Sequence, residues 1–213
     1  MLFENINFLL EERGAPALSS SDFLKLNPNE LYEITSQLEV TFESLNTVDL
    51  RKRKELLKNR DIKLLILDVD GVFTDGGLYY TSSNEEIKKF NVKDGMAITQ
   101  AIKSGLEIGI ISAASRSEVV ELRAKILGIQ NVYVGKEPKL NVLETWLYKM
   151  GIGFDEVGYI GDDINDIAIL EKVGVGACPA DAVYNVKKKA AYVLRNGGGH
   201  GCIREYIELF VVN

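Results

Sequence analysis

Four acidic side chains form two pairs that could hold a metal ion together: Asp68 with Asp70, and Asp162 with Asp163. Side chains alternate along a strand, so Asp68 and Asp70 start out on the same side of the backbone. Two carboxylates a few ångströms apart repel by roughly 4 kcal/mol at an effective dielectric constant near 20, so a cation or a shared proton is expected there. Oxygen ligands of this kind suit Mg²⁺ and a phosphate better than Zn²⁺. Helix capping is the plainer alternative for Asp162 or Asp163.

Three more polar residues stand where further metal or phosphate ligands are expected. Asp166 follows the second acidic pair and adds another carboxylate. Ser112 ends an apolar run, where a hydroxyl and the N–H groups of a helix N-terminus can bind an anion. Lys139 begins a helical segment and can bring a positive charge to phosphate oxygens. Each residue alone also suits a cap or an exposed surface. In sequence order, however, carboxylate, hydroxyl, ammonium and carboxylate together fit phosphoryl transfer through an aspartyl-phosphate.

Five apolar runs of strand length precede or separate these residues, and they predict the fold. The runs are 64–67, 108–111, 132–134, 157–160 and 175–178. Segments of helical spacing lie between them, at 94–104, 117–127, 140–150 and 165–172. This alternation predicts an α/β protein with a Rossmann-like parallel sheet covered by helices on both faces. Ligands of such sheets bind beyond the carboxyl ends of the strands, where the polar residues stand.

The first 60 residues have a different pattern, so we expect a helical N-terminal extension at 1–60 and the α/β domain at 61–213. A short first helix carries Phe3, Ile6 and Leu10. A longer apolar helix face carries Leu31, Ile34, Leu38, Phe42 and Leu45. The basic run 51–54 could be a nucleic-acid patch, but a solvated helix face is the better interpretation because the protein is acidic.

Composition excludes several classes of protein. The chain has 213 residues, 46% of them hydrophobic and 26% charged, which suits one α/β domain with a small appendage. Its net charge of −6 argues against a nucleic-acid partner. No apolar run approaches the roughly 20 residues of a membrane span, and acidic residues occupy the place of a basic secretory signal. With only Cys178 and Cys202, no disulfide framework is expected, so we expect a cytoplasmic protein with reduced thiols.

Four motifs in this order resemble those of the haloacid dehalogenase-like phosphatases, over residues 62–210. They are Asp68-Val-Asp-Gly-Val, Ser112, Lys139 and Gly161-Asp-Asp-Ile-Asn-Asp. Residues 70–80, 89–95 and 198–205 resemble one subgroup more closely. This subgroup comprises the 3-deoxy-D-manno-octulosonate 8-phosphate (KDO 8-phosphate) phosphatases and the related nonulosonate (sialic acid type) 9-phosphate phosphatases.

The resemblance implies catalytic and metal-binding roles. Asp68 would attack phosphorus, and Asp70 would protonate the leaving sugar oxygen and then activate water. Mg²⁺ would be held by the Asp68 carboxylate, the Asp70 backbone carbonyl and Asp162. Asp166 or Asp163 would act through a water or from behind the ligands. Ser112 and Lys139 would hold the phosphoryl oxygens.

The resemblance also implies residues that contact the substrate. These candidates are Gly71, Lys93, Ala113, His200 and Arg204. Two departures from the subgroup bear on them. Lys93 stands where many relatives have Arg, and Ala113-Ala-Ser-Arg replaces the usual Gly and charged residue, so Ser115 is a fallback for Ser112 as the phosphate hydroxyl. An exposed loop histidine with no catalytic task remains the plainer alternative for His200.

The intervals between the motifs leave no room for a cap domain, so the protein is expected to be capless. Residues 77–91 are predicted to form a β-hairpin. In the resembling subgroup this hairpin packs with its copies in a homotetramer, and a neighbour's glycine-rich tail helps to close the site. Gly197, Gly198, Gly199 and Gly201 would permit that approach, although a mobile turn suits them equally well.

The sequence therefore predicts a magnesium-dependent phosphatase that acts on a phosphorylated 2-keto-3-deoxy sugar acid of eight or nine carbons. Two alternatives stay open. One is a catalytically silent scaffold that regulates, or oligomerises with, a sugar-nucleotide enzyme. The other is a phosphate receiver domain, although the phosphorylated Asp of a receiver lies on a middle strand, whereas here the acidic pair opens the core.

Overall fold

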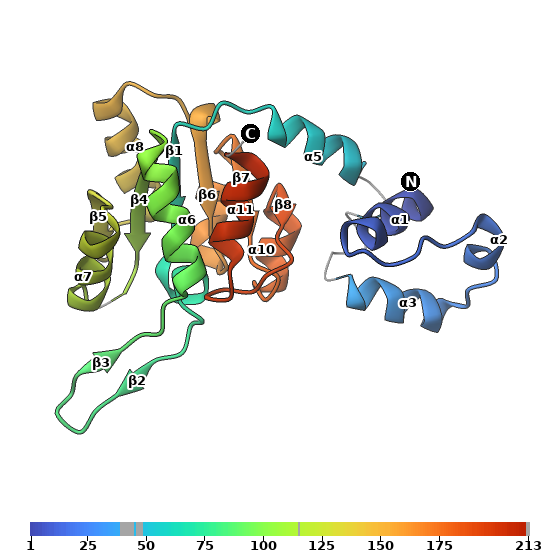
Figure 1. The fold of residues 1–213 in the computed structure, drawn as a ribbon, viewed down its shortest axis with the longest axis horizontal. Helices are drawn as coiled ribbons and strands as arrows, with labels where there is room; N and C mark the ends of the chain where they lie inside the picture. Colours follow the sequence, from blue (N-terminus) through green and yellow to red (C-terminus); the bar gives the residue numbers. More distant parts are fainter. Residues whose placement is uncertain (39–44, 46–48, 115, 212–213) are drawn as a thin grey trace. The chain divides into compact units, whose positions relative to one another are not determined.

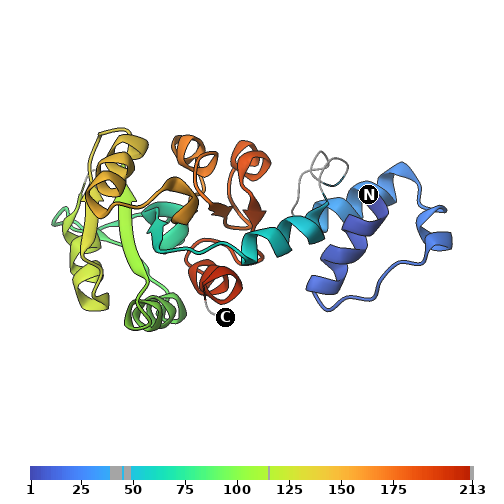
Figure 2. The ribbon, with the colours of Figure 1, turned by 90° about the horizontal axis from the view of Figure 1, so that it is seen from above.

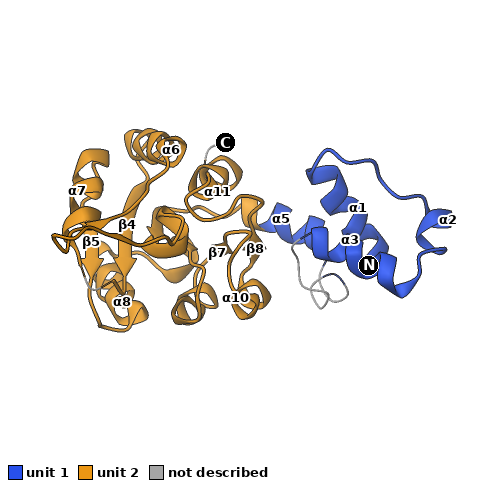
Figure 3. Ribbon diagram, turned by 90° about the horizontal axis from the view of Figure 1, so that it is seen from below, with its two compact units in different colours: residues 1–56 blue, residues 57–213 orange. Residues whose placement is uncertain are grey.

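The chain divides into two compact units, residues 1–56 and residues 57–213 (Figure 3). The computed structural model describes residues 1–38, 45, 49–114 and 116–211. The division falls four residues before the expected end of the N-terminal extension, within helix α5 (Leu50–Lys58).

Six parallel strands form the sheet of the second unit, in the order β5-β4-β1-β6-β7-β8 (Figure 1). They are β1 (Leu64–Leu67), β4 (Glu107–Ser112), β5 (Asn131–Val134), β6 (Val157–Ile160), β7 (Val175–Cys178) and β8 (Tyr192–Val193). Leu67 of β1 lies opposite Ile110 of β4 and Ile160 of β6. The predicted α/β fold is confirmed, and the residues that follow these three central strands emerge at one edge of the sheet.

Helices cover both faces of the sheet because its strands are apolar on both sides (Figure 2). Leu65 and Leu67 belong to one buried cluster and Leu64 and Ile66 to another. The first cluster includes side chains of α6 (Val92–Lys103), α7 (Glu118–Leu127) and α11 (Cys202–Phe210). The second includes side chains of α8 (Lys139–Met150), α9 (Ile167–Leu170) and α10 (Tyr184–Lys189).

The predicted hairpin is present within residues 77–91. Strands β2 (Tyr79–Tyr80) and β3 (Glu86–Ile87) pair antiparallel and project from the sheet (Figure 1). Four of its apolar side chains are exposed: Leu78, Tyr79, Tyr80 and Ile87. An isolated bridge between Thr74 and Phe90 closes its base.

Some predicted helices differ in length from the observed ones. The segment 165–172 was expected to be one helix, but it contains the end of a short 3-10 turn, η3 (Ile164–Asp166), and the four-residue α9. The chain must turn back there, because Gly174 donates to the Phe154 carbonyl at 2.7 Å just before β7 begins. The helix α11 was not predicted, because its glycine-rich approach resembles a loop.

The described part of the first unit is helical. It contains α1 (Leu2–Glu12), α2 (Ser20–Phe23) and α3 (Pro28–Gln37), around a small cluster of Ile6, Leu38 and Leu45. The predicted long apolar face continues past the end of α3, and Phe42 lies outside the described residues.

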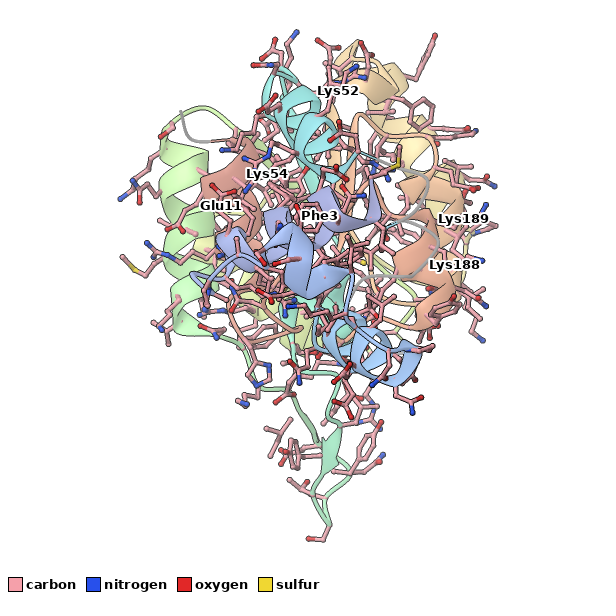
Figure 4. The ribbon with its side chains drawn as sticks, turned by 90° about the vertical axis from the view of Figure 1, so that its right-hand side faces the viewer. Phe3, Glu11, Lys52, Lys54, Lys188 and Lys189 are labelled. Carbon is pink, nitrogen blue, oxygen red and sulfur yellow. The ribbon has the colours of Figure 1, made fainter. Side chains whose placement is uncertain are left out.

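The basic run at 51–54 is not a solvated face throughout, so that prediction was wrong at Lys54. Lys54 is buried and pairs with Glu12, while Arg51 pairs with Glu11. Figure 4 labels Lys54 and Glu11. Acidic residues of α1 thus neutralise two of the four basic residues. Among the described residues, no helix has both the length and the apolar content that a membrane crossing requires.

Candidate active site

A cleft of about 340 Å³ opens at the carboxyl ends of β1, β4 and β6. Its lining residues are Asp68, Asp70, Gly71, Gly76, Ser112, Ala113, Ala114, Lys139, Asp162, Asp163 and Asn165. A larger hollow of about 980 Å³ lies at the opposite edge of the sheet, beside Lys63 and Glu107. None of the residues of the four motifs lines that hollow, so the chemistry belongs to the smaller cleft.

Asp68 is fixed at the bottom of this cleft by the end of β1. Its backbone N–H donates to the Ile160 carbonyl at 3.0 Å, which continues the pairing of β1 with β6. Its side chain is buried, and Oδ1 accepts the Val69 N–H at 2.7 Å. Oδ2 lies 2.7 Å from Lys139 Nζ at the start of α8. The nucleophile candidate is therefore held at both oxygens.

Asp166 supports this pair from behind. Its Oδ1 accepts from Lys139 Nζ at 2.6 Å and from the Tyr159 hydroxyl at 2.5 Å. Its Oδ2 accepts the backbone N–H groups of Asp162 and Asp163 at 2.9 and 3.1 Å. Both oxygens of a fully buried carboxylate are thus engaged, which suits a residue that orients its neighbours.

Tyr159 was not predicted as part of the site. It lies on β6 inside an apolar run and is fully buried, so its sequence context indicates only core packing. The single signal available was the need of a buried tyrosine hydroxyl for a hydrogen-bond partner.

Carboxylate oxygens of Asp68, Asp162 and Asp166 lie within 4.8 Å of one another. Burial, followed by repulsion from Asp166, raises the pKa of Asp68 to about 7. Burial, followed by repulsion from Asp68 and Asp166, raises the pKa of Asp162 to about 8. Asp162 Oδ1 is buried and has no hydrogen-bond partner among the described residues. One lysine for three carboxylates leaves excess negative charge, so these residues fit a divalent cation bound by oxygen.

The turn after Asp68 brings the backbone close to Asp162. Asp70 has φ −77° and ψ 121°, and Gly71 then adopts φ +82°. A Cβ at Gly71 would lie 2.1 Å from Asp162 Oδ2, so only glycine fits beneath that carboxylate. Behind the turn, a Cβ at Gly198 would lie 1.9 Å from the Gly71 carbonyl oxygen. The glycine-rich segment therefore packs against the turn at Gly71 in its own chain.

The end of β4 supplies a cradle for an anion. Ser112 is buried, and its Oγ accepts the Ala114 N–H at 3.1 Å. Ser112, Ala113 and Ala114 share the cleft with Lys139. The fallback residue Ser115 lies outside the described residues. Hydroxyl, backbone and ammonium groups thus face the same small volume as the carboxylates, which suits a phosphoryl group.

Three of the predicted substrate contacts do not line this cleft within the chain itself. Lys93, His200 and Arg204 are all exposed. His200 Nδ1 lies 2.6 Å from the Gly198 carbonyl oxygen, and Arg204 pairs with Glu208 at 2.7 Å. Of the predicted metal ligands, Asp163 caps η3 through the Ile164 N–H. The assignments of these residues stay predictions.

Comparison with known proteins adds a family to this geometry. A family model described as haloacid dehalogenase-like hydrolase matches residues 40–203. The chain is 41% identical, over 157 residues, to the 3-deoxy-D-manno-octulosonate 8-phosphate phosphatase of Escherichia coli (strain K12). The aligned region covers 74% of this chain and 83% of that protein.

Solved structures agree with this match. A crystal structure of the 3-deoxy-D-manno-octulosonate 8-phosphate phosphatase from Yersinia pestis has a TM-score of 0.69 at 38% identity, and covers 76% of this chain and 84% of that one. The enzyme of the same name from Moraxella catarrhalis, crystallised with magnesium ion, phosphate ion and KDO, has a TM-score of 0.70 at 31% identity, and covers 75% and 92%.

Proposed function

The chain belongs to the haloacid dehalogenase-like hydrolase family, and from this premise we propose that it is a magnesium-dependent phosphatase of KDO 8-phosphate. One observation carries the proposal. Asp68 contacts Lys139 and has a carboxylate oxygen within 4.8 Å of one of Asp162, in a cleft that Ser112 also lines. The relatives named for KDO 8-phosphate support the choice of substrate.

The residues divide the reaction between them. An Asp68 carboxylate oxygen attacks phosphorus as the ester P–O bond breaks, which gives an aspartyl-phosphate. Asp70 gives its proton to the leaving sugar oxygen, and then takes one from the water that hydrolyses the aspartyl-phosphate. Ser112 and Lys139 hold the phosphoryl oxygens, and Asp166 and Tyr159 keep Lys139 in place.

The carboxylates of Asp68 and Asp162 and the backbone carbonyl of Asp70 would hold Mg²⁺. The bound ion supplies positive charge that offsets the crowded carboxylate and phosphate oxygens. The buried Oδ1 of Asp162, to which no described residue hydrogen-bonds, supports this assignment.

A homotetramer built on the hairpin is part of the proposal. Leu78, Tyr79, Tyr80 and Ile87 are about half exposed or more, as expected of a surface that another copy covers. In such an assembly Lys93, His200 or Arg204 could contact the carboxylate of the sugar acid. Light scattering after gel filtration tests the mass, and a monomer would refute this part alone. We also propose a cytoplasmic location, because both cysteines are free thiols.

Phosphate release from sugar phosphates tests the function. We expect KDO 8-phosphate to give the highest kcat/KM, ahead of nonulosonate 9-phosphates and hexose phosphates, with no release in EDTA. Asp68→Asn should keep the fold, checked by circular dichroism, and lose all turnover, whereas full activity would refute the nucleophile. A preference for hexose phosphates would refute the substrate class. Wild-type protein that hydrolysed no phosphate ester with Mg²⁺ would favour the scaffold alternative.

A further inference from the structure

A buried lysine on the hairpin contacts the carboxylate of Asp70. Lys88 follows β3, and its side chain is 1% exposed. Its Nζ forms ion pairs with Asp70 Oδ1 and with Glu86 Oε1, the latter at 3.3 Å. The bridge between Thr74 and Phe90 places this strand beside the loop that carries Asp70. A charged group with so little exposure stays buried only when it is paired, and both of its partners are carboxylates.

The contacts of Asp70 are one-sided. Lys88 Nζ and Thr74 Oγ1 both approach Oδ1, the latter at 3.5 Å. Among the described residues nothing hydrogen-bonds to Oδ2, and the residue lines the cleft. Lys88 itself is not among the residues that line the cleft. One oxygen of Asp70 is anchored, and the other is left for the substrate.

The anchor is itself held in place. The side chain of Glu86 is 6% exposed, and its Oε2 accepts from the Tyr80 hydroxyl at 3.1 Å on the opposite strand. Glu86 also pairs with Lys88, so the buried ammonium group keeps a carboxylate partner besides Asp70. Arg116, beyond the anion cradle, contacts the same hairpin through the Asn84 side chain at 3.1 Å.

We propose that Lys88 is a positioning residue for the general acid, an inference that rests on the proposed phosphatase function. With Oδ1 held by Lys88, Oδ2 is the oxygen from which Asp70 acts on the leaving group. When the P–O bond to the sugar breaks, its electron pair stays on the sugar oxygen, and that oxygen takes the Oδ2 proton while phosphorus bonds to Asp68. The hairpin thereby contributes a positioning residue to the active site of its own chain.

Leaving groups of different basicity separate this role from a structural one. We expect Lys88→Met to lower kcat/KM by about 10- to 100-fold for the sugar phosphate that the wild type hydrolyses best, because its alkoxide leaves with a proton. For 2,4-dinitrophenyl phosphate, whose leaving group needs no proton, the loss should be much smaller. kcat/KM reports formation of the aspartyl-phosphate, so the shared second step does not mask the difference.

Lys89→Met is the matched control. Lys89 is the next residue along the hairpin, is 60% exposed and pairs with Asp75. Both substrates should keep their kcat/KM in this variant. Should Lys88→Met fail to fold, Lys88→Arg keeps the charge but changes its reach, and must show a smaller loss with the same dependence on leaving group.

The outcomes discriminate between the two proposals. Equal losses for both substrates, or no loss for either, would overturn the role of Lys88 while wild-type hydrolysis of the aryl phosphate still upheld the phosphatase. Hydrolysis of neither substrate by the wild type would overturn the proposed function and this inference together. A loss confined to the sugar phosphate supports both.

Discussion

At the scale of single residues, the cleft is a place of unbalanced charge. Asp68 and Asp162 line it together with Lys139, Asp166 lies behind them, and Asp162 has a buried oxygen that no described residue satisfies. Such an arrangement costs free energy in the protein alone and regains it when a cation binds. The site is thus built for its bound state, at the expense of the stability of the free chain.

This imbalance predicts how stability depends on pH. The pKa of Asp162 is raised to about 8 and that of Asp68 to about 7, so the native state without metal binds protons that the unfolded chain releases at lower pH. Stability without metal should therefore fall as pH rises from near 4 towards 8. We expect Asp162→Asn to melt at a higher temperature than the wild type at pH 8 in EDTA, and at a similar temperature at pH 5. Saturating Mg²⁺ should reverse the order at pH 8, and an unchanged difference across this pH range would contradict the account.

The contact beneath Asp162 yields a second expectation. Gly71→Ala adds a methyl group 2.1 Å from Asp162 Oδ2, so the carboxylate must move, and we expect Mg²⁺ affinity to fall at least tenfold by titration calorimetry. Gly128→Ala is the control, because Gly128 has φ +85° and a Cβ there meets nothing within 4 Å. Alanine at either position has a positive φ and costs about 1 kcal/mol of backbone strain, but the Gly128→Ala variant leaves the cleft unchanged. Equal Mg²⁺ affinities in the two variants would rule out steric displacement.

Sequence patterns could place some of these residues and not others. Asp68 and Ser112 directly follow or end strands whose order in a parallel sheet is strongly constrained, so their convergence was predictable. The roles of Tyr159 and Lys88 were not predictable, because the neighbouring residues give no sign of function. Tyr159 lies in an apolar strand, and Lys88 lies in a hairpin whose sequence suggests exposure. Their roles come from contacts across the fold that local pattern does not encode.

At the scale of elements, one carboxylate joins two helices. Asp94 on α6 is fully buried, its Oδ1 accepts the Arg204 N–H at 2.8 Å, and its Oδ2 accepts the Gly201 N–H at 3.2 Å at the start of α11. Burial raises the pKa of Asp94, and these backbone hydrogen bonds oppose the rise. The helix N-terminus that it caps lies immediately after the segment packed against Gly71.

Loss of this cap should be costly. We expect Asp94→Ala to lower the free energy of unfolding by about 1–3 kcal/mol in urea titrations, because the N–H groups of Gly201 and Arg204 lose their acceptor. Glu118→Ala removes an exposed carboxylate from the first turn of α7, and should change stability by less than about 0.5 kcal/mol. Similar values for the two variants would show that the interhelical cap contributes little.

Element boundaries were predictable where periodicity was long and less so where tertiary contacts decide. The core strands and the helices α6, α7 and α8 appear close to their expected limits. The helix expected at 165–172 begins late, because Asp166 ends the turn η3 and accepts the N–H groups of Asp162 and Asp163, and it ends early because the chain turns back before β7. β8 has two residues, too few for any pattern to predict.

At the scale of the whole molecule, chemistry is confined to one unit. Every residue that lines the cleft belongs to residues 57–213, as do both large buried clusters. We therefore expect a chain that lacks residues 1–56 to fold and to keep its kcat/KM, measured by phosphate release alongside the full chain. Loss of activity with an intact circular dichroism spectrum would show that the N-terminal unit takes part in catalysis.

Gly198 and Gly71 pack together but lie far apart in the sequence, so this contact forms late during synthesis of the α/β unit. On the ribosome, all four motifs are synthesised well before residues 198–201 emerge. Until then Gly71 lacks its contact with Gly198, so a nascent polypeptide carries all four motifs without this part of their packing. We therefore expect activity to appear only when synthesis of this unit is nearly complete.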